Sequence, residues 1–416
     1  MGFLFCGYKR CIVDETLPVG VRREVRGAIC QTGSPGRAAL VAVRKPGFFV
    51  QAWFMSKNQN GSVDIVYLWV DGSDPVWRQK RKQAAAVLSA TDRGEMALYG
   101  NVEGRFRDND ELRFSLRALE KFFPTHGHIY LVTDGQTPVW FKPSAGITVV
   151  DHRDLIEPDL LPTFDSGNIE SYIHRIPNLS ERFFYLNDDV FFGAPVQLAD
   201  WFYPGGTFVA WSDDDEITDE PMRADATALE NACRLSHQWL RAHASNGTSA
   251  SAAGSAQARA YQPVFRTFAH SPRPMLRSRM LLLEQRAPEL FDLVRSTVFR
   301  AWDKPTIVSD FVLRWALANG QAKVCEHSHL YVSTGTGELH ALDEALRGLS
   351  DAVGQLDFFC INDTTDNALP HDQRLAKVRN TLLNLFPQPS QFERTMTDTR
   401  RPAASSVNAD QVMSAA

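Results

Sequence analysis

Two adjacent carboxylates interrupt an apolar stretch of the sequence, "FFYLNDDVFFG" at residues 183–193. Asn187, Asp188 and Asp189 stand between hydrophobic runs on both sides. A buried strand carries two unpaired charges only at a large cost in free energy. The pattern therefore predicts a strand that ends at Asn187 and opens its acidic pair onto a site. Such a pair suits a hard divalent cation with oxygen ligands, Mg²⁺ or Mn²⁺.

Further acidic residues follow other predicted strands; they are Asp71, Asp74, Asp134, Asp151 and Asp154. In open α/β sheets, ligands bind outside the carboxyl ends of the strands, so these groups could share one rim with the acidic pair. Aspartate also ends strands simply because it favours turns. For Asp134 and Asp154 we favour that structural interpretation, and for Asp71 both interpretations stay open.

The sequence offers arginines, and no glycine loop, for binding phosphate. It contains neither a Walker-A motif nor a GxGxxG motif after a strand, which argues against P-loop and dinucleotide-binding proteins. Arg105 and Arg107 in "RFRD" are candidates, because guanidinium groups bind phosphate in a bidentate manner. Ordinary surface solvation explains the same two residues equally well.

The histidines provide one candidate base. His270 in "AHSPRP" lies between an apolar run and two prolines, and a histidine can act as a general base near neutral pH. The local sequence alone favours a structural role. His174 stands four residues after Glu170 on a possible helix, and His327 and His329 form a weak metal-binding pattern. Structural roles are favoured for these three as well.

Apolar runs predict the strands that position these groups. The runs cover residues 63–70, 128–133, 146–150, 182–187 and 206–211. Continuous apolar runs are typical of strands covered on both faces, as in a parallel sheet. Helical patterns alternate with them, so the sequence predicts an α/β fold with a largely parallel sheet.

The clearest helix is predicted over residues 107–123. Leu112, Leu116, Leu119 and Phe123 fall on one face of it. Asp108 or Asn109 is expected to cap its N-terminus.

The chain of 416 residues, 44% of them hydrophobic, is long enough for more than one unit. We predict a weakly patterned N-terminal extension at 1–62, an α/β core at 63–242 and a low-complexity linker or loop at 243–260. A mostly helical portion at 261–395 would complete the site, and a disordered tail would follow at 396–416.

Composition excludes several classes of protein. A net charge of −5 gives no sign of bulk nucleic-acid binding. Six scattered cysteines without a CxxC pair indicate reduced thiols and a cytoplasmic setting. No apolar run is long enough for a transmembrane helix, and the N-terminus lacks a secretory signal pattern.

Several stretches together resemble successive conserved blocks of the Stealth family. The stretches are "DIVYLWVDGSDPVW", "RFRDNDELRFSLRALEKFFPTHGHIYLVTDGQTPVW", "LPTFDSGNIESYIHRIPNLSERFFYLNDDVFFGAPV" and "FFCINDTTDN" with "FPQPSQFE". A looser region, "FAHSPRPM" with "VFRAW", resembles the family's third block. Stealth proteins are bacterial capsular polysaccharide hexose-1-phosphate phosphotransferases, and the catalytic subunit of N-acetylglucosamine-1-phosphotransferase is similar. The resemblance covers residues 63–395.

This resemblance implies a fold, a reaction and a site. The fold would be Rossmann-like and similar to glycosyltransferase-A enzymes. The reaction would move a sugar-1-phosphate from a nucleotide diphosphate sugar, expected to be UDP-linked, to a hydroxyl of a growing polysaccharide. Catalysis is expected at Asp189, His270 and Arg300. Donor binding is expected at Asp71, Gly72, Arg107, Asp108 and Asn187. The metal ligands would be Asp188, Asp189 and Asn362.

Partners and alternatives follow from the same resemblance. Capsule assembly machinery at the inner membrane is a candidate for peripheral association. A metal-dependent glycosyltransferase that attacks C1 of the sugar is the first alternative, and it would release a nucleoside diphosphate in place of a monophosphate. A non-catalytic carbohydrate-binding protein is the second alternative, and it would bind donor without turnover.

Overall fold

The computed structural model describes residues 61–244, 262–335, 338–365 and 372–394. The predicted extension at 1–62, the linker at 243–260 and the tail at 396–416 lie almost wholly outside these ranges.

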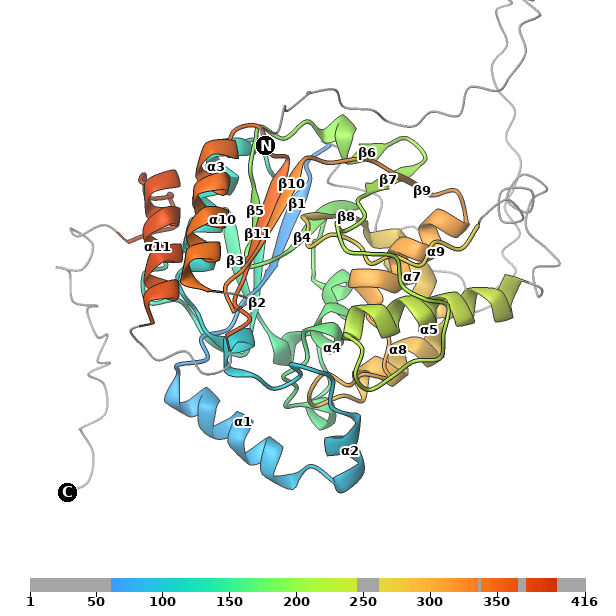
Figure 1. The fold of residues 1–416 in the computed structure, drawn as a ribbon. Helices are drawn as coiled ribbons and strands as arrows, with labels where there is room; N and C mark the ends of the chain where they lie inside the picture. Colours follow the sequence, from blue (N-terminus) through green and yellow to red (C-terminus); the bar gives the residue numbers. More distant parts are fainter. Residues whose placement is uncertain (1–60, 245–261, 336–337, 366–371, 395–416) are drawn as a thin grey trace, which may run out of the picture.

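A five-stranded sheet with the order β3-β2-β1-β4-β8 forms the centre of the molecule (Figure 1). Its strands are β1 (Asp64–Leu68), β2 (Ile129–Thr133), β3 (Ile147–Asp151), β4 (Arg182–Asn187) and β8 (Arg273–Leu276). The first four run parallel, and β8 runs antiparallel beside β4. The predicted α/β class with a largely parallel sheet is confirmed, and the four predicted strands lie within a residue or two of their expected bounds.

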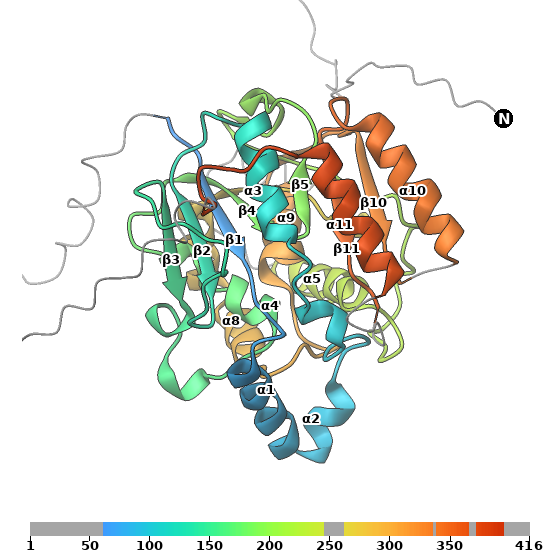
Figure 2. The same ribbon diagram turned by 90° about the vertical axis from the view of Figure 1, so that its left-hand side faces the viewer.

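Both faces of this sheet are covered by helices, as the continuous apolar runs require. Ile65 and Tyr67 pack on the side of α3 (Glu111–Phe122), together with α10 (Leu339–Ala352) and α11 (Gln373–Leu385). Val66 and Leu68 pack on the opposite side. That side is covered by α4 (Ser166–Glu170), α7 (Arg277–Arg286), α8 (Pro288–Arg295) and α9 (Val312–Ala318). Figures 1 and 2 show the two helical layers.

Two small sheets extend the structure. One has the order β10-β11-β5 and is built from β5 (Val190–Phe192), β10 (His329–Ser333) and β11 (Phe358–Asn362). The other has the order β6-β7-β9 and is built from β6 (Phe202–Tyr203), β7 (Gly206–Val209) and β9 (Ala322–Val324). The run at 206–211 therefore forms a strand, as predicted. This strand, β7, lies in the small sheet with β6 and β9 and not in the five-stranded sheet.

The segment after residue 261 contributes strands to the same sheets. It contains the expected helices, but it also supplies β8 to the main sheet and β11 as the partner of β5. β8 and β11 lie on different sides of β4, so sequence-distant segments close around the end of that strand (Figure 1). The division of the chain into domains stays a prediction.

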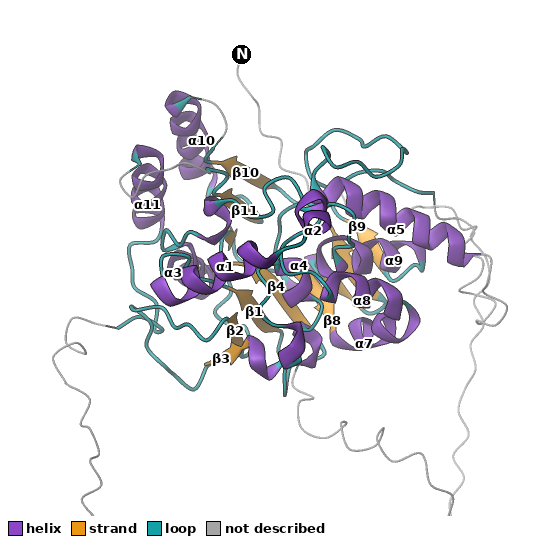
Figure 3. Ribbon diagram, turned by 90° about the horizontal axis from the view of Figure 1, so that it is seen from below, coloured by secondary structure: helices purple, strands orange, loops and turns teal. Residues whose placement is uncertain are grey.

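The remaining helices are α1 (Pro75–Val87), α2 (Ala90–Glu95) and α5 (Ala228–Ala244). α1 and α2 follow β1 and lie below the sheet, at the carboxyl ends of its parallel strands (Figures 1 and 3). No helix of the described residues is long and apolar enough to cross a membrane.

The predicted cap of α3 is wrong. The helix begins at Glu111, and Asp110 precedes it in a left-handed conformation (φ 68°) without a capping side-chain hydrogen bond. Asp108 instead accepts a bond from the backbone N–H of Asp110 (3.0 Å), which forms the turn before the helix. Asn109 donates to the Glu111 carboxylate through its side chain (2.8 Å), so Glu111 is held at the helix start.

Candidate active site

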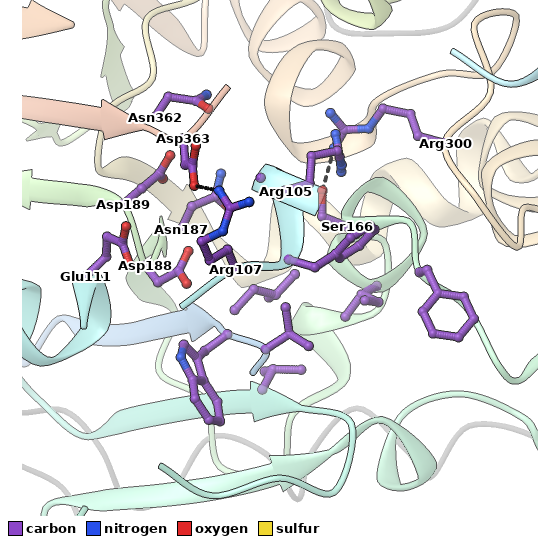
Figure 4. Close-up of a pocket in the computed structure, with 18 of the residues that line it drawn as sticks. Arg105, Arg107, Glu111, Ser166, Asn187, Asp188, Asp189, Arg300, Asn362 and Asp363 are labelled. Atoms are coloured by element: carbon purple, nitrogen blue, oxygen red, sulfur yellow. Dashed lines mark hydrogen bonds and ion pairs between the residues drawn. The ribbon is translucent and has the colours of Figure 1, made fainter. Parts of the chain in front are cut away.

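A pocket opens at the carboxyl ends of β1, β4 and β11 and gathers most of the predicted site residues (Figure 4). Those brought together are Arg107, Asn187, Asp188, Asp189, His270, Arg300 and Asn362. They come from five separate parts of the chain, which the fold brings together. Figure 4 shows Glu111, Asp188 and Asp189 on one side and Arg105, Ser166 and Arg300 on the other.

The acidic side of the pocket has strongly shifted protonation equilibria. Burial, then the charges of Asp189, Glu111 and Asp108, raises the pKa of Asp188 well above its ordinary value. Burial raises the pKa of Asp189 to about 6 and that of Glu111 to about 8. Carboxylates that share a site repel one another and favour protonation. The charges of Arg273 and Arg105 lower the pKa of Asp189, but the raised values show that they do not fully compensate the cluster.

The atoms of Asp189 show where such a charge would act. Its Oδ2 lies 3.5 Å from the Cys360 thiol, and its Oδ1 is buried without a hydrogen-bond partner in the described residues. Within the described residues, no three His, Cys, Asp or Glu side chains form an arrangement that could hold a metal ion by themselves. A cation here would need Asn362, water or substrate oxygens as well. The orphaned Asp189 oxygen and the surplus of carboxylates fit a cation of that kind.

Arg107 and Asp363 tie this side of the pocket to β11. Arg107 Nη1 forms an ion pair with Asp363 Oδ2 and donates to Thr365 Oγ1 (2.7 Å). Asp363 Oδ1 also accepts from Thr334 Oγ1 (3.1 Å). The residue expected to bind donor is thus held in place by a carboxylate directly after Asn362.

The opposite side of the pocket is cationic. Arg300 donates to Asp165 Oδ1 (3.3 Å) and to the Ser166 hydroxyl. Arg105 lies close enough for its charge to interact with that of Arg300, and burial, followed by this repulsion, lowers the pKa of Arg105 to about 9. Its Nε is buried without a partner in the described residues. Two guanidinium groups thus lie close together, and one nitrogen of Arg105 has no hydrogen-bond partner in the described residues. Such a pair forms a site for an anion.

His270 lines the pocket as a neutral imidazole. Burial, then the charges of Arg273 and Arg300, lowers its pKa to about 4. Its ring centroid lies 5.3 Å from that of Tyr331. A neutral imidazole can accept a proton at pH 7, which is what a general base must do.

A buried network lies behind Asn187. The Tyr185 hydroxyl is 2.6 Å from Asn187 Oδ1 and 2.8 Å from Glu170 Oε1. Ser309 donates to the other oxygen of Glu170 (3.2 Å). Glu170 is 1% exposed, and burial raises its pKa. The network fixes the amide of Asn187 from the core side of β4.

Three predicted donor-binding residues do not line the pocket. Asp71 accepts bonds from the Ser73 N–H (2.8 Å) and hydroxyl (2.6 Å), so it forms a turn. The Gly72 N–H donates to Phe106 O (2.7 Å), and a Cβ on Gly72 would lie 2.1 Å from that oxygen, so only glycine fits. Asp108 acts on the pocket through its charge. Their role in donor binding stays a prediction.

The other acidic strand ends have structural partners. Asp74 caps α1, and Asp134 forms an ion pair with Lys80. Asp151 accepts from the Arg153 backbone and side chain, and Asp154 completes the same turn. The carboxyl ends of these parallel strands do share one edge of the sheet, but the four carboxylates have local partners and do not line the pocket, which favours the turn interpretation.

The three other histidines singled out from the sequence lie outside the pocket. His174 is not on one helix with Glu170, because α4 ends there and a separate turn carries His174, which bonds Glu284 (2.8 Å). His327 stacks on Trp201 at 4.2 Å, and His329 stacks on Phe358 at 4.9 Å. The structural interpretation favoured for all three is confirmed.

Some residues that form or support the pocket are not predicted from the sequence. Glu111, Asp165 and Asp363 all line or support the pocket, but each reads locally as a helix start or a turn. Asp165 could not be found because its partner, Arg300, lies 135 residues away in sequence.

Three regions of the chain match conserved regions of Stealth proteins. Residues 61–86 match conserved region 1, residues 105–209 match conserved region 2 and residues 354–404 match conserved region 4. The chain therefore belongs to the Stealth family. The matched regions include the acidic pair, Arg107 and Asn362, whereas His270 and Arg300 lie outside them.

Curated relatives carry names that agree with this family. An exopolysaccharide phosphotransferase of Streptomyces coelicolor is 36% identical over 80% of this chain and 33% of its own length. The exopolysaccharide phosphotransferase CpsY of Mycobacterium leprae is 33% identical over 82% of this chain and 58% of its own. The chain thus spans from one third to about three fifths of the length of these relatives.

Among solved structures, the chain is similar to the galactosyltransferase LgtC in complex with donor and acceptor sugar analogues. The TM-score is 0.37 and the identity 9%, over 79% of this chain and 96% of that one. The bifunctional glycosyltransferase WbbM also gives 0.37, at 10% identity, over 80% of this chain and 51% of that one. Both of these proteins are named as glycosyltransferases.

Proposed function

We propose that the chain is an exopolysaccharide phosphotransferase that moves a sugar-1-phosphate from a nucleotide diphosphate sugar to a sugar hydroxyl. The observation that carries the proposal is one pocket that combines an acidic pair, two adjacent arginines and a neutral imidazole. Phosphoryl transfer depends mainly on positioning and on stabilising charge at the transferring group. Family membership and the names of the relatives support the same activity.

The arginines are the proposed binding site for the donor diphosphate. Arg105 and Arg300 present two positive charges to one side of the pocket, and Asp165 and Ser166 hold Arg300. Charge on the equatorial phosphoryl oxygens is spread in the transition state, where such donors act best. A UDP-linked donor is part of the proposal, on the resemblance alone.

A divalent cation, Mg²⁺ or Mn²⁺, is the proposed cofactor. Asp188, Asp189 and Asn362 would hold it, because they line the acidic side of the pocket and one Asp189 oxygen has no partner in the described residues. When bound, such a cation neutralises phosphate charge and stabilises the leaving group.

His270 is the proposed general base for the acceptor. It takes the proton of the acceptor hydroxyl as that oxygen attacks the sugar-bearing phosphorus. One P–O bond to the acceptor forms, and the P–O bond of the diphosphate bridge breaks, so a nucleoside monophosphate leaves. The bond between C1 and oxygen in the transferred sugar stays intact, and its anomeric configuration is retained.

The partners proposed are a growing polysaccharide as acceptor and, on the resemblance alone, capsule assembly machinery at the cytoplasmic face of the inner membrane. A metal-dependent glycosyltransferase is the alternative activity, because the acidic pair would serve attack on carbon equally well.

One experiment separates these activities. The protein is incubated with a panel of nucleotide diphosphate sugars, Mg²⁺ and neutral oligosaccharides, and products are followed by phosphorus NMR. The proposal expects a phosphodiester signal and stoichiometric nucleoside monophosphate. Release of nucleoside diphosphate without a phosphodiester would establish the glycosyltransferase, and donor binding without turnover would indicate a carbohydrate-binding protein.

A further inference from the structure

A second groove lies beside the catalytic pocket and differs from it in chemistry. Its lining includes Tyr99, Tyr331, Ser333, Thr364 and Ala341. None of the described residues that line it carries a charge, whereas the pocket has several carboxylates and arginines. A phosphorylated donor is therefore favoured in the pocket, and a neutral ligand is favoured in the groove.

Two tyrosines dominate the surface of the groove. Tyr99 is 55% exposed and Tyr331 is 45% exposed, which is unusual for large aromatic side chains in a folded domain. Tyr99 also has a left-handed backbone conformation with φ 62°. This conformation is rare for a bulky residue, and such outliers gather at binding sites. The fold thus accepts strain to hold this ring at the surface.

Each tyrosine belongs to a segment that contacts a proposed catalytic residue. The Tyr331 ring centroid lies 5.3 Å from that of His270, at an interplanar angle of 62°. On the other side, the Ala97 N–H donates to Arg300 O (2.8 Å), two residues before Tyr99. Gly100 packs so closely on Arg300 O that an added Cβ would lie 2.7 Å from it. The two tyrosines therefore lie near His270 and the backbone of Arg300.

Hydroxyl groups line the floor between the rings. Ser333 Oγ and Thr364 Oγ1 are 2.8 Å apart, and the Gly335 N–H donates to Thr364 Oγ1 (2.9 Å). Thr364 follows directly after Asn362 and Asp363, which line the pocket. Aromatic faces beside hydroxyls match a pyranose, which has an apolar C–H face and a polar edge.

We infer that this groove, between Tyr99 and Tyr331, binds the uncharged terminal sugar rings of the acceptor and directs the acceptor hydroxyl toward His270. The inference rests on the proposed function, since it assigns the acceptor of that reaction to a surface. The sugar rings stack on the tyrosines, and Ser333 and Thr364 receive the hydroxyls.

The test compares acceptor and donor kinetics in tyrosine variants of the full chain. Tyr99→Ala and Tyr331→Ala are expected to raise the KM for a neutral oligosaccharide acceptor about fivefold or more, because each removes a stacking ring. The donor KM stays unchanged in Tyr99→Ala; Tyr331 also hydrogen-bonds Asn362, so Tyr331→Ala is read for the acceptor KM alone. Tyr99→Phe, which keeps the ring, is expected to behave like wild type. Leu383→Ala provides a matched control, because Leu383 is an apolar side chain on α11 that is 48% exposed.

A binding measurement separates this inference from the proposed function. Saturation-transfer NMR with methyl hexopyranosides and neutral disaccharides is expected to show contact with wild type and its loss in Tyr99→Ala. If Tyr99→Ala loses the contact with the sugars but no donor supports transfer, the groove is a sugar-binding site and the phosphotransferase proposal fails. Transfer with an unchanged acceptor KM in both alanine variants would overturn the groove. An equal rise of the donor KM and the acceptor KM in Tyr99→Ala would also overturn the inference about the groove. The same holds if none of the sugars in the panel binds the wild type.

Discussion

At the scale of single residues, the charge state of His270 decides whether it can act as a base. Burial and the nearby Arg273 and Arg300 lower its pKa to about 4, so the neutral imidazole prevails at pH 7. We expect His270→Ala to slow transfer by about 10²–10⁴-fold, the usual contribution of a general base. Donor affinity, measured by titration calorimetry, should be retained.

The pH dependence of the same residue has a defined sign. Because the neutral form is the base, the contribution of His270 should be lost as the pH falls through about 4 and should be constant between pH 6 and 8. His329→Ala is the control, since that ring stacks on Phe358 outside the pocket. A His270→Ala rate near that of wild type at every pH would refute the base assignment.

The carboxylates of the pocket make a second prediction at this scale, about stability. Burial and three neighbouring carboxylates raise the pKa of Asp188, so its charged form destabilises the folded state at pH 7. Without divalent cations, Asp188→Asn should therefore be more stable to urea than wild type. The gain should grow by about 1.4 kcal/mol for each pH unit above the unfolded pKa of about 3.9, until the pH reaches the raised pKa of the folded state.

Added Mg²⁺ should reverse this order. A cation that binds only the folded protein raises the melting temperature of wild type, and the effect should be weaker or lost in Asp188→Asn. Thermal unfolding with and without Mg²⁺ measures this without any assay of turnover. A melting temperature of wild type that does not respond to Mg²⁺ or Mn²⁺ would count against the cation site.

At the scale of elements, β4 does more than carry the acidic pair. Tyr185 links Asn187 at the end of the strand to Glu170 in α4. Tyr185→Phe removes the hydroxyl alone, so we expect a loss of about 1 kcal/mol in unfolding free energy and several-fold weaker donor binding. Tyr172→Phe is the matched control, because its buried hydroxyl has no partner in the described residues. Equal effects of the two variants would contradict the positioning role.

The helical layer on the other face is held by a buried ion cluster. Glu393, 3% exposed, accepts from Arg117 Nε (2.6 Å) and Arg113 Nε (2.5 Å) on α3. Despite burial, the hydrogen bonds of Arg117, the Ser390 N–H and Arg113 lower the pKa of Glu393 to about 2. Its stabilisation is therefore complete above the unfolded pKa of about 4.5 and is lost as the pH falls through about 2.

Glu393→Gln tests this cluster. It should cost about 3 kcal/mol of unfolding free energy at pH 7, because the buried Arg117 and the half-buried Arg113 lose their counter-charge. The difference from wild type should shrink as the pH falls below about 4.5. Glu344→Gln on α10 is the control, since its partners His340 and Arg347 are exposed and 3.8–3.9 Å away. A difference that stays constant down to pH 3 would contradict this account.

At the scale of the whole molecule, local sequence predicts the strands and the acidic pair well. The apolar runs around residues 65 and 184 are covered on both faces, and Asp188 opens onto a pocket at the strand end. These features depend on neighbours in sequence. The apolar run at 206–209 predicts a strand of the main sheet, but this strand lies in another sheet. Its pairing with β9 depends on contacts between distant parts of the chain, which local sequence does not reveal.

What local sequence could not predict is which distant residues meet. Arg107 pairs with Asp363 across 256 positions, and Arg300 pairs with Asp165 across 135. Local sequence offers His270 only as a candidate base for which a structural role is favoured, and Arg300 follows from the family resemblance alone. The structure places both in one pocket with Asp189, and their catalytic roles stay a prediction.

The most direct test of the central claim follows one atom through the reaction. A nucleotide diphosphate sugar is made with a heavy oxygen isotope between C1 of the sugar and the phosphorus, and it is incubated with the protein, Mg²⁺ and acceptor. If attack is at phosphorus, mass spectrometry finds the label in the phosphodiester product and none in the released nucleoside monophosphate. Label that leaves with a nucleoside diphosphate would show attack at carbon and contradict the account.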